Sequence, residues 1–213
     1  MLELTLLGTL AYMIGIQGRA EEASTVIARG EHLLEEIGQS VWLFPVLLAF
    51  YGAWVSQPDV AERELRPVYD GLKKVGERSH FCSVATMLAQ AVYAQGRYDE
   101  AGELAREAER TARPNDVHSH IVWRGTQAKV LAQRGDLETA ELLAREAVAF
   151  AGESDFLHSH ADALTDLAEV LKLAGRPGDA VAALEGAIRL HEQKGNVVAA
   201  ARARVVLGDV VQD

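Results

Sequence analysis

The 213-residue sequence has little of what several protein classes depend on. Its single cysteine, Cys82, excludes an internal disulfide framework and is typical of a reducing cytoplasm. Five prolines beside 18 glycines exclude a collagen-like chain, and aromatic residues make up only 6%. The longest apolar run, Val41 to Val55, has 15 residues and contains Pro45, so it is too short to cross a bilayer. These absences predict a cytoplasmic location and no membrane partner.

The charge is one-sided and the composition is helical. Lys and Arg number 21 against 31 Asp and Glu, which gives a net charge of -10. So acidic a surface repels a phosphate backbone and excludes nonspecific nucleic-acid binding. The N-terminal segment lacks the positive region of a signal peptide, since Glu3 is acidic. Hydrophobic residues make up 49%, with 34 alanines and 26 leucines, which favours a folded, helix-rich chain.

A short phrase recurs along the whole chain. GRAEEA, SQPDVA, GRYDEA, GDLETA and GRPGDA begin at Gly18, Ser56, Gly96, Gly135 and Gly175, which are 38, 40, 39 and 40 residues apart. Alanine stands seven residues before each of these five anchors, at positions 11, 49, 89, 128 and 168. Alanine also stands five residues after each anchor, at positions 23, 61, 101, 140 and 180. Five copies in one register indicate a repeat architecture.

Each repeat has the pattern of two helices with a tight turn at the anchor. Apolar residues recur at helical spacing before and after it, and the glycine suits the left-handed cap that ends a helix. Asp116 and Asp155 are candidate N-caps. Small alanines let the paired helices approach closely. The pattern predicts eleven helices and no strand, at 2–16, 20–37, 40–55, 58–75, 79–95, 98–112, 117–134, 137–151, 156–174, 177–194 and 196–211. Contacts should lie mainly between adjacent repeats.

The two alanine columns around a glycine turn resemble the tetratricopeptide repeat. The resemblance covers essentially the whole chain and implies an all-α, right-handed solenoid across residues 1–213, with repeats at about 2–38, 39–76, 77–115, 116–154 and 155–195 and a terminal helix at 196–211. The period exceeds the roughly 34 residues usual for that repeat. Units of 39–40 residues, with phrases such as AQAVYAQGRYDEA, are similar to the helical arrays of large bacterial ATP-dependent regulators, which carry LuxR-type DNA-binding or nucleotidyl-cyclase domains.

That second resemblance implies a position within a larger protein. The chain starts in an apolar helix without a polar outer face, whereas the end repeats of a solenoid need one. We therefore expect it to be covalently joined to further domains. The leading hypothesis is a non-catalytic protein-interaction scaffold of a bacterial signalling or transcription-regulatory protein, with a protein or peptide partner. The alternative is a sensor whose concave groove binds a small ligand or peptide and controls an attached ATPase or output domain.

Motifs for catalysis are missing from the sequence. It contains no GxxxxGK[ST], GxSxG, HExxH or paired CxxC. Acidic residues alternate with basic ones, as in AREAERTAR, which is typical of a solvated helix face. Cys82 has no base nearby in the sequence, and we expect a buried structural thiol. The prediction is therefore no enzyme, no cofactor and no metal.

The histidines form the one cluster in the sequence that suggests a chemical role. Ser-His recurs with His80, His120 and His160 at a spacing of 40, and His118 and His158 extend two of these pairs to HSH. Residues one period apart stack in a solenoid, so the imidazoles are candidates for a metal site or a pH switch near pH 6.5. The other interpretation is packing in the first turn of each helix. No Cys or carboxylate recurs beside them at the same period to complete a ligand set.

The surface expected to bind a partner is the concave face, lined in this repeat class by the first helix of each unit. Counting back from the anchors selects a stripe that is apolar and aromatic in the N-terminal half and charged in the C-terminal half. Its candidate residues are Tyr12, Phe50, Trp54, Gln90, Tyr93, Lys129, Glu169 and Lys172. If the aromatic members anchor a partner, Tyr12, Phe50, Trp54 and Tyr93 should lie partly exposed along one groove. The alternative is that Phe50 and Trp54 are buried against a neighbour or a missing N-terminal domain.

Overall fold

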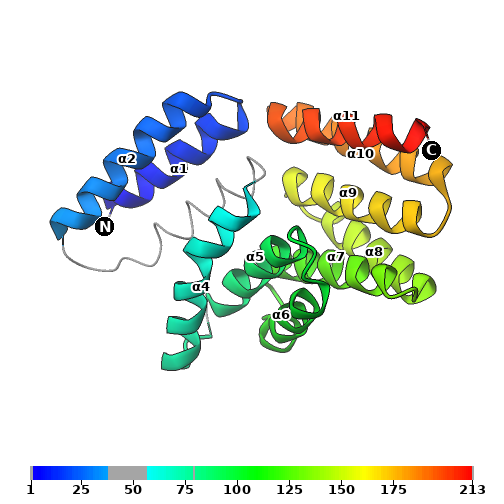
Figure 1. Ribbon diagram of the computed structural model, residues 1–213, viewed down its shortest axis with the longest axis horizontal. Helices are drawn as coiled ribbons and strands as arrows, with labels where there is room; N and C mark the ends of the chain where they lie inside the picture. Colours follow the sequence, from blue (N-terminus) through cyan, green and yellow to red (C-terminus); the bar gives the residue numbers. More distant parts are fainter. Residues whose placement is uncertain (1, 38–56, 79, 213) are drawn as a thin grey trace.

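The computed structural model describes residues 2–37, 57–78 and 80–212, and within these residues every regular element is a helix. The chain runs through them as an array of helical hairpins (Figure 1). The helices are α1 (Leu2–Ile16), α2 (Ala20–Ile37), α4 (Pro58–Val75), α5 (Phe81–Tyr93), α6 (Tyr98–Thr111), α7 (Val117–Gln133), α8 (Leu137–Gly152), α9 (Leu157–Leu173), α10 (Pro177–Lys194) and α11 (Val197–Gln212).

The bounds of these helices agree with the sequence prediction to within two residues. The helix expected at 40–55 lies outside the described residues. Asp116 caps α7 as predicted, because its Oδ1 accepts a hydrogen bond from the backbone N–H of Ser119 at 3.1 Å. The predicted cap at Asp155 is wrong: α9 follows Phe156, and no side chain caps its first turn. Asp136, for which no cap was predicted, caps α8 through Thr139.

The repeated glycines and alanines do what their spacing predicts. Of the five anchors, Gly18, Gly96, Gly135 and Gly175 have φ between 70° and 86°, the left-handed region that glycine adopts at low cost. The described members of both alanine columns are at most 2% exposed. Any larger side chain there would separate the two helices of a hairpin, so the alanines set their close packing.

The first helix of each repeat forms an inner layer. Helices α5, α7 and α9 pack on one another across successive repeats, and each also packs against the second helix of its own hairpin. The array curves far enough that α1 contacts α11, and a methyl group on Gly18 would lie 3.6 Å from a methyl of Val197. Figure 1 shows the first hairpin beside the last helix. Contacts do lie mainly between adjacent repeats, and the meeting of α1 with α11 is one exception, which the sequence did not predict.

The hydrophobic core follows the array instead of forming one central mass. One cluster runs from α4 through α5 and α6 to α7, and another runs from α7 through α9 and α10 to α11. Cys82 is buried, as expected, and its thiol donates to the carbonyl oxygen of Ala108 at 3.2 Å. Burial raises the pKa of this thiol. Among the described residues, no helix is both long and apolar enough to cross a membrane.

Candidate functional site

A buried ion pair lies at the centre of the inner layer. Lys129 of α7 places its Nζ 2.7 Å from Oδ1 of Asp166 and 4.0 Å from Oε2 of Glu169, both on α9. Burial lowers the pKa of Lys129, but the two carboxylates outweigh that effect and raise it, so the ammonium stays charged. Burial also raises the pKa of Asp166, and Lys129 offsets this only in part.

A glycine makes room for this pair. A Cβ atom on Gly125, in the middle of α7, would overlap the carboxylate of Asp166. A side chain here would displace that carboxylate from its position beside Lys129, so the glycine makes room for the ion pair. Glycine is otherwise unfavourable inside a helix. The residue therefore serves the contact between α7 and α9.

Tyr93 joins the third repeat to the same group of residues. Its hydroxyl donates a short hydrogen bond to Glu169, 76 residues away, and accepts one from Nε2 of Gln133 at 3.3 Å. The Nζ of Lys129 lies 4.5 Å from the centre of the Tyr93 ring, a cation–π arrangement. Burial, together with the charge of Glu169, raises the pKa of Tyr93. We call Tyr93, Lys129, Gln133, Asp166 and Glu169 the inner-face cluster.

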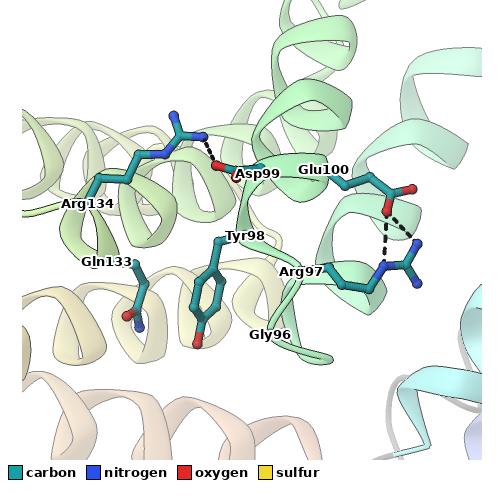
Figure 2. A pocket seen from close by; sticks show the side chains of 7 residues that line it. All are labelled: Gly96, Arg97, Tyr98, Asp99, Glu100, Gln133 and Arg134. Atoms are coloured by element: carbon teal, nitrogen blue, oxygen red, sulfur yellow. Dashed lines mark hydrogen bonds and ion pairs between the residues drawn. The ribbon is translucent and has the colours of Figure 1, made fainter.

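An open pocket of about 410 Å³ adjoins the inner-face cluster where α5 turns into α6 and α7 ends. Figure 2 shows the side chains of Tyr98 and Gln133 pointing the same way, with ion pairs on either side of them. The Tyr98 ring lies 5.0 Å from that of Tyr93. The residues lining the pocket are Gly96, Arg97, Tyr98, Asp99, Glu100, Gln133 and Arg134. It offers an aromatic surface, an amide and charges of both signs to one ligand.

A second group of polar side chains lies further along the inner layer. Nε2 of His158 is 3.3 Å from Oδ2 of Asp162 on the same helix, and Nε2 of His191 on α10 is 3.8 Å from Oδ1 of that carboxylate. The two imidazole rings are 5.8 Å apart. Of the described residues, these are the three that cluster closely enough to share one metal ion. We call them the histidine cluster.

The pKa values in this second group follow from its enclosure. The curved array surrounds Asp162 with protein, although about a third of its side chain is exposed. The resulting desolvation raises the pKa of Asp162 to about 6. The positive charges of His191, Lys129 and Arg202 lower this pKa but do not outweigh the desolvation. Burial lowers the pKa of His158 to about 3. Tyr12 of α1 lies near Asp162, and burial with that charge raises its pKa to about 12.

The structure brings several predicted concave-face residues together and leaves others apart. Tyr93, Lys129 and Glu169 meet in the inner-face cluster, while Tyr12 is half-buried beside the histidine cluster. Gln90 is half-buried and Lys172 is exposed; Phe50 and Trp54 lie outside the described residues. The expectation that Tyr93 is a partly exposed anchor is wrong, because it is 8% exposed and its hydroxyl is bonded within the protein.

The repeated Ser-His pairs do not stack as one set of imidazoles. His80 is exposed and lies beside Glu77. His120 hydrogen-bonds the Arg113 carbonyl through Nε2 and receives the Trp123 indole N–H at Nδ1. His160 is half-buried against Gly152, and burial lowers its pKa. His80, His120 and His160 therefore each contact residues of their own surroundings, in turns and in packed helices.

Two residues of the clusters were not predicted from the sequence: Asp166, which pairs with Lys129, and His191, which lies beside Asp162. Asp166, nine residues before the Gly175 anchor, is not among the candidate residues counted from the anchors, and His191 belongs to an outer helix. A signal for Asp166 was present, because it is a carboxylate in the buried face that includes Ala163 and Val170. His191 carried no such signal, since its partners stand about 30 residues away in sequence.

One protein family matches part of the chain. The tetratricopeptide-repeat model matches residues 160–194, the segment from α9 to the end of α10. This segment contains Asp162, Asp166 and His191. No curated protein matches the chain in sequence.

Solved structures match over nearly the whole chain. The TPR-like repeats of a putative kinesin light chain from Podosopora anserina share 20% identity, with a TM-score of 0.58 over 90% of this chain and 96% of that one. A thermophilic TPR protein of Thermus thermophilus shares 18% identity, with a TM-score of 0.61 over 97% and 100%. BtubC (BKLC) from P. vanneervenii shares 16%, with a TM-score of 0.56 over 92% and 83%. The fold is a TPR-like helical solenoid.

Proposed function

We propose that this chain is a non-catalytic scaffold that binds a segment of a partner protein at the pocket beside Tyr98. The TPR-like fold generally mediates protein–protein interactions, which supports this class of function. The observation that carries the proposal is the pocket itself, which opens next to the inner-face cluster. Tyrosine is a frequent anchor of interfaces because it offers a large apolar ring and a polar tip.

The chemistry of the pocket favours a polypeptide segment of mixed polarity. Arg97 pairs with Glu100 and Arg134 pairs with Asp99 across its lining, so its charges are balanced (Figure 2). Gln133 supplies an amide, which both donates and accepts hydrogen bonds as a peptide backbone requires. A strongly charged ligand would find no excess of either sign here. A peptide with an apolar side chain for the Tyr98 ring fits these groups.

Photocrosslinking in the host cell tests this assignment. A photoreactive amino acid at Gln133, exposed in the pocket, should capture a defined partner, and Tyr98→Ala should reduce that product at least severalfold. The matched control is the same amino acid at Glu185, exposed on the outer helix α10. The proposal fails if both positions capture the same proteins, or if Tyr98→Ala leaves the product at Gln133 unchanged in a folded chain.

We also propose that the scaffold is the repeat region of a larger, cytoplasmic bacterial signalling or transcription-regulatory protein. The 39–40-residue period and the phrases around its turns support this context. The buried, unpaired Cys82 is consistent with a reducing compartment. Reading the open reading frame on both sides of this segment tests it: an adjoining nucleotide-binding or output domain supports the proposal, and stop and start codons at both ends contradict it.

A sensor function is the second candidate, and the buried charges of the inner layer favour it. Lys129, Asp166 and Glu169 connect α7 to α9, so a small ligand that competed for them would change the packing of successive repeats. Such a ligand should bind the isolated chain tightly and raise its melting temperature. If photocrosslinking captures a partner protein and no small ligand raises the melting temperature, the scaffold function is favoured.

A further inference from the structure

We infer that His158, Asp162 and His191 form a binding site for a divalent first-row transition metal ion, for which Zn²⁺ is the probe. The donor set is two imidazoles and one carboxylate, a combination that zinc and its neighbours bind readily. Magnesium and calcium prefer sets made of oxygen atoms, so this set discriminates against them. The inference is independent of the partner-binding function proposed above.

The distances between the donor atoms suit a single ion. One ligand atom from each of the three residues lies within 4.8 Å of the other two. The closest pairs join Asp162 to His158 at 3.3 Å and to His191 at 3.8 Å. Ligands at about 2.0–2.2 Å from a tetrahedral zinc are separated by about 3.3–3.6 Å. Small movements of these side chains therefore complete three corners of a tetrahedron, and the fourth remains for water.

Helical geometry presets two of the ligands. His158 and Asp162 are four residues apart in α9, a spacing that places both side chains on one face of the helix. His191 enters from α10, the other helix of the same hairpin, so one ion would join the two helices. The hairpin itself is held by other contacts, including Ala168 and Ala180 in its core. The site is thus built on packed helices instead of loops.

The burial of the histidines suits metal binding. His191 is 2% exposed, and its Nε2 faces the Asp162 carboxylate, so Nε2 is the nitrogen placed to bind the ion. Burial also lowers the pKa values of His158 and His191, which keeps both imidazoles neutral, the form that binds metals.

Positive groups near the site set a limit on its affinity. Arg202 of α11 and Lys129 act on Asp162, while Lys194 and His118 act on His158. Lys129 is already balanced by Asp166 and Glu169. Asp162 is the one anionic ligand of the three, so its charge favours an incoming cation against these positive groups, and binding depends on it most.

Calorimetric titration of the purified chain with Zn²⁺ tests the site, and Co²⁺ absorption reports its geometry. We expect one ion per chain, no heat with Mg²⁺, and visible bands of four-coordinate Co²⁺. Asp162→Asn keeps the size of the side chain and should weaken zinc binding at least about tenfold, as should His191→Gln. The matched control is His32→Ala, since His32 and Glu36 form an exposed pair of the same four-residue spacing and have no third ligand among the described residues.

Circular dichroism melts of each variant separate loss of the site from loss of the fold. If His191→Gln does not fold, the isosteric Asp162→Asn carries the test. Zinc that binds the wild type and Asp162→Asn with equal affinity overturns the proposal, because that result describes adventitious binding to the acidic surface. Binding that His32→Ala weakens as much as Asp162→Asn overturns it as well. Absence of any zinc binding to the folded wild-type chain does so directly.

Discussion

Two groups of paired charges in this molecule reach opposite electrostatic outcomes. In the inner-face cluster, burial raises the pKa of Asp166 even with Lys129 at 2.7 Å. On the side where α4 meets the turn before α6, Glu62 is also desolvated, yet its pKa falls to about 2 because Arg66, Gln95 and Arg97 all hydrogen-bond it. The number of donors around a carboxylate, weighed against its desolvation, decides the direction of its pKa.

The two groups also differ in how much they stabilise the contacts between helices. The Glu62 group joins α4 to the next hairpin at a partly exposed position, where solvent screens each pair and limits what it contributes. Lys129 and Asp166 join α7 to α9 in a place that water hardly reaches, so neither charge tolerates the loss of its partner. Disturbing the inner layer should therefore cost much more stability than disturbing the outer ion pairs.

The largest effect is expected from Lys129→Ala. Removing the ammonium leaves Asp166 buried and unpaired, and breaking a buried pair in this way costs about 3–5 kcal/mol. Lys172→Ala, on an exposed position of the same face, should cost less than about 1 kcal/mol. Urea unfolding of both variants measures the difference. Equal free energies of unfolding would show that Lys129 is solvated in solution.

Glycine-to-alanine changes test how closely α7 and α9 approach. Gly125→Ala would place a methyl group against the Asp166 carboxylate and should destabilise the fold by about 1–3 kcal/mol. A methyl group at Gly208 in α11 has no described atom within 4 Å, so Gly208→Ala should stabilise the fold by about 0.5–1 kcal/mol, because alanine is the better helix former. Thermal melts give both signs. Stabilisation by both changes would mean that Asp166 does not lie over Gly125.

The sequence predicted the repeated features of this fold because they recur at a fixed period. Gly96 and Ala101 stand five residues apart in a pattern that appears five times, and the four copies with a described glycine anchor have the same local cause: a left-handed turn and a close helix contact. Helix positions followed from that register. Only some contacts of the site follow that period: Gln133 meets Tyr93 at a separation of 40 residues, whereas Tyr93 meets Glu169 at 76. Lys129 meets Asp166 at a separation of 37 residues, because the neighbouring inner helices are offset relative to the repeat.

The histidine cluster shows the same limit more clearly. The residue one period before His158 is His118. The imidazole that joins His158 in the histidine cluster is instead that of His191, on the other helix of the same hairpin. Pairing within an antiparallel hairpin brings together residues whose separation depends on their distance from the turn. Asp162 lies on α9 with His158, while His191 and Arg202 act on it from α10 and α11. Only the packed helices define that set.

Acid titration should distinguish the Glu62 group from the rest. Because the folded-state pKa of Glu62 is lowered to about 2, its contribution is fully present above its unfolded value of 4.5 and is lost as the pH falls toward 2. Partial exposure of the arginines limits the effect to about 1 kcal/mol. Glu62→Gln should flatten the decline of stability over this range. Glu103→Gln, at an exposed pair with Arg106, should leave it unchanged.

The smallest effect is expected from Tyr93→Phe. The change removes the hydroxyl that donates to Glu169 and accepts from Gln133 but keeps the ring beside Lys129 and Tyr98. Glu169 is 39% exposed, so water can replace the lost donor, and the cost should be about 1 kcal/mol or less. Tyr98→Phe, whose hydroxyl lines the open pocket, is the control and should change stability still less. Urea unfolding of the two variants beside Lys129→Ala ranks the three groups. A loss from Tyr93→Phe as large as that from Lys129→Ala would mean that the hydroxyl, and not the buried ion pair, holds α5 and α7 against α9.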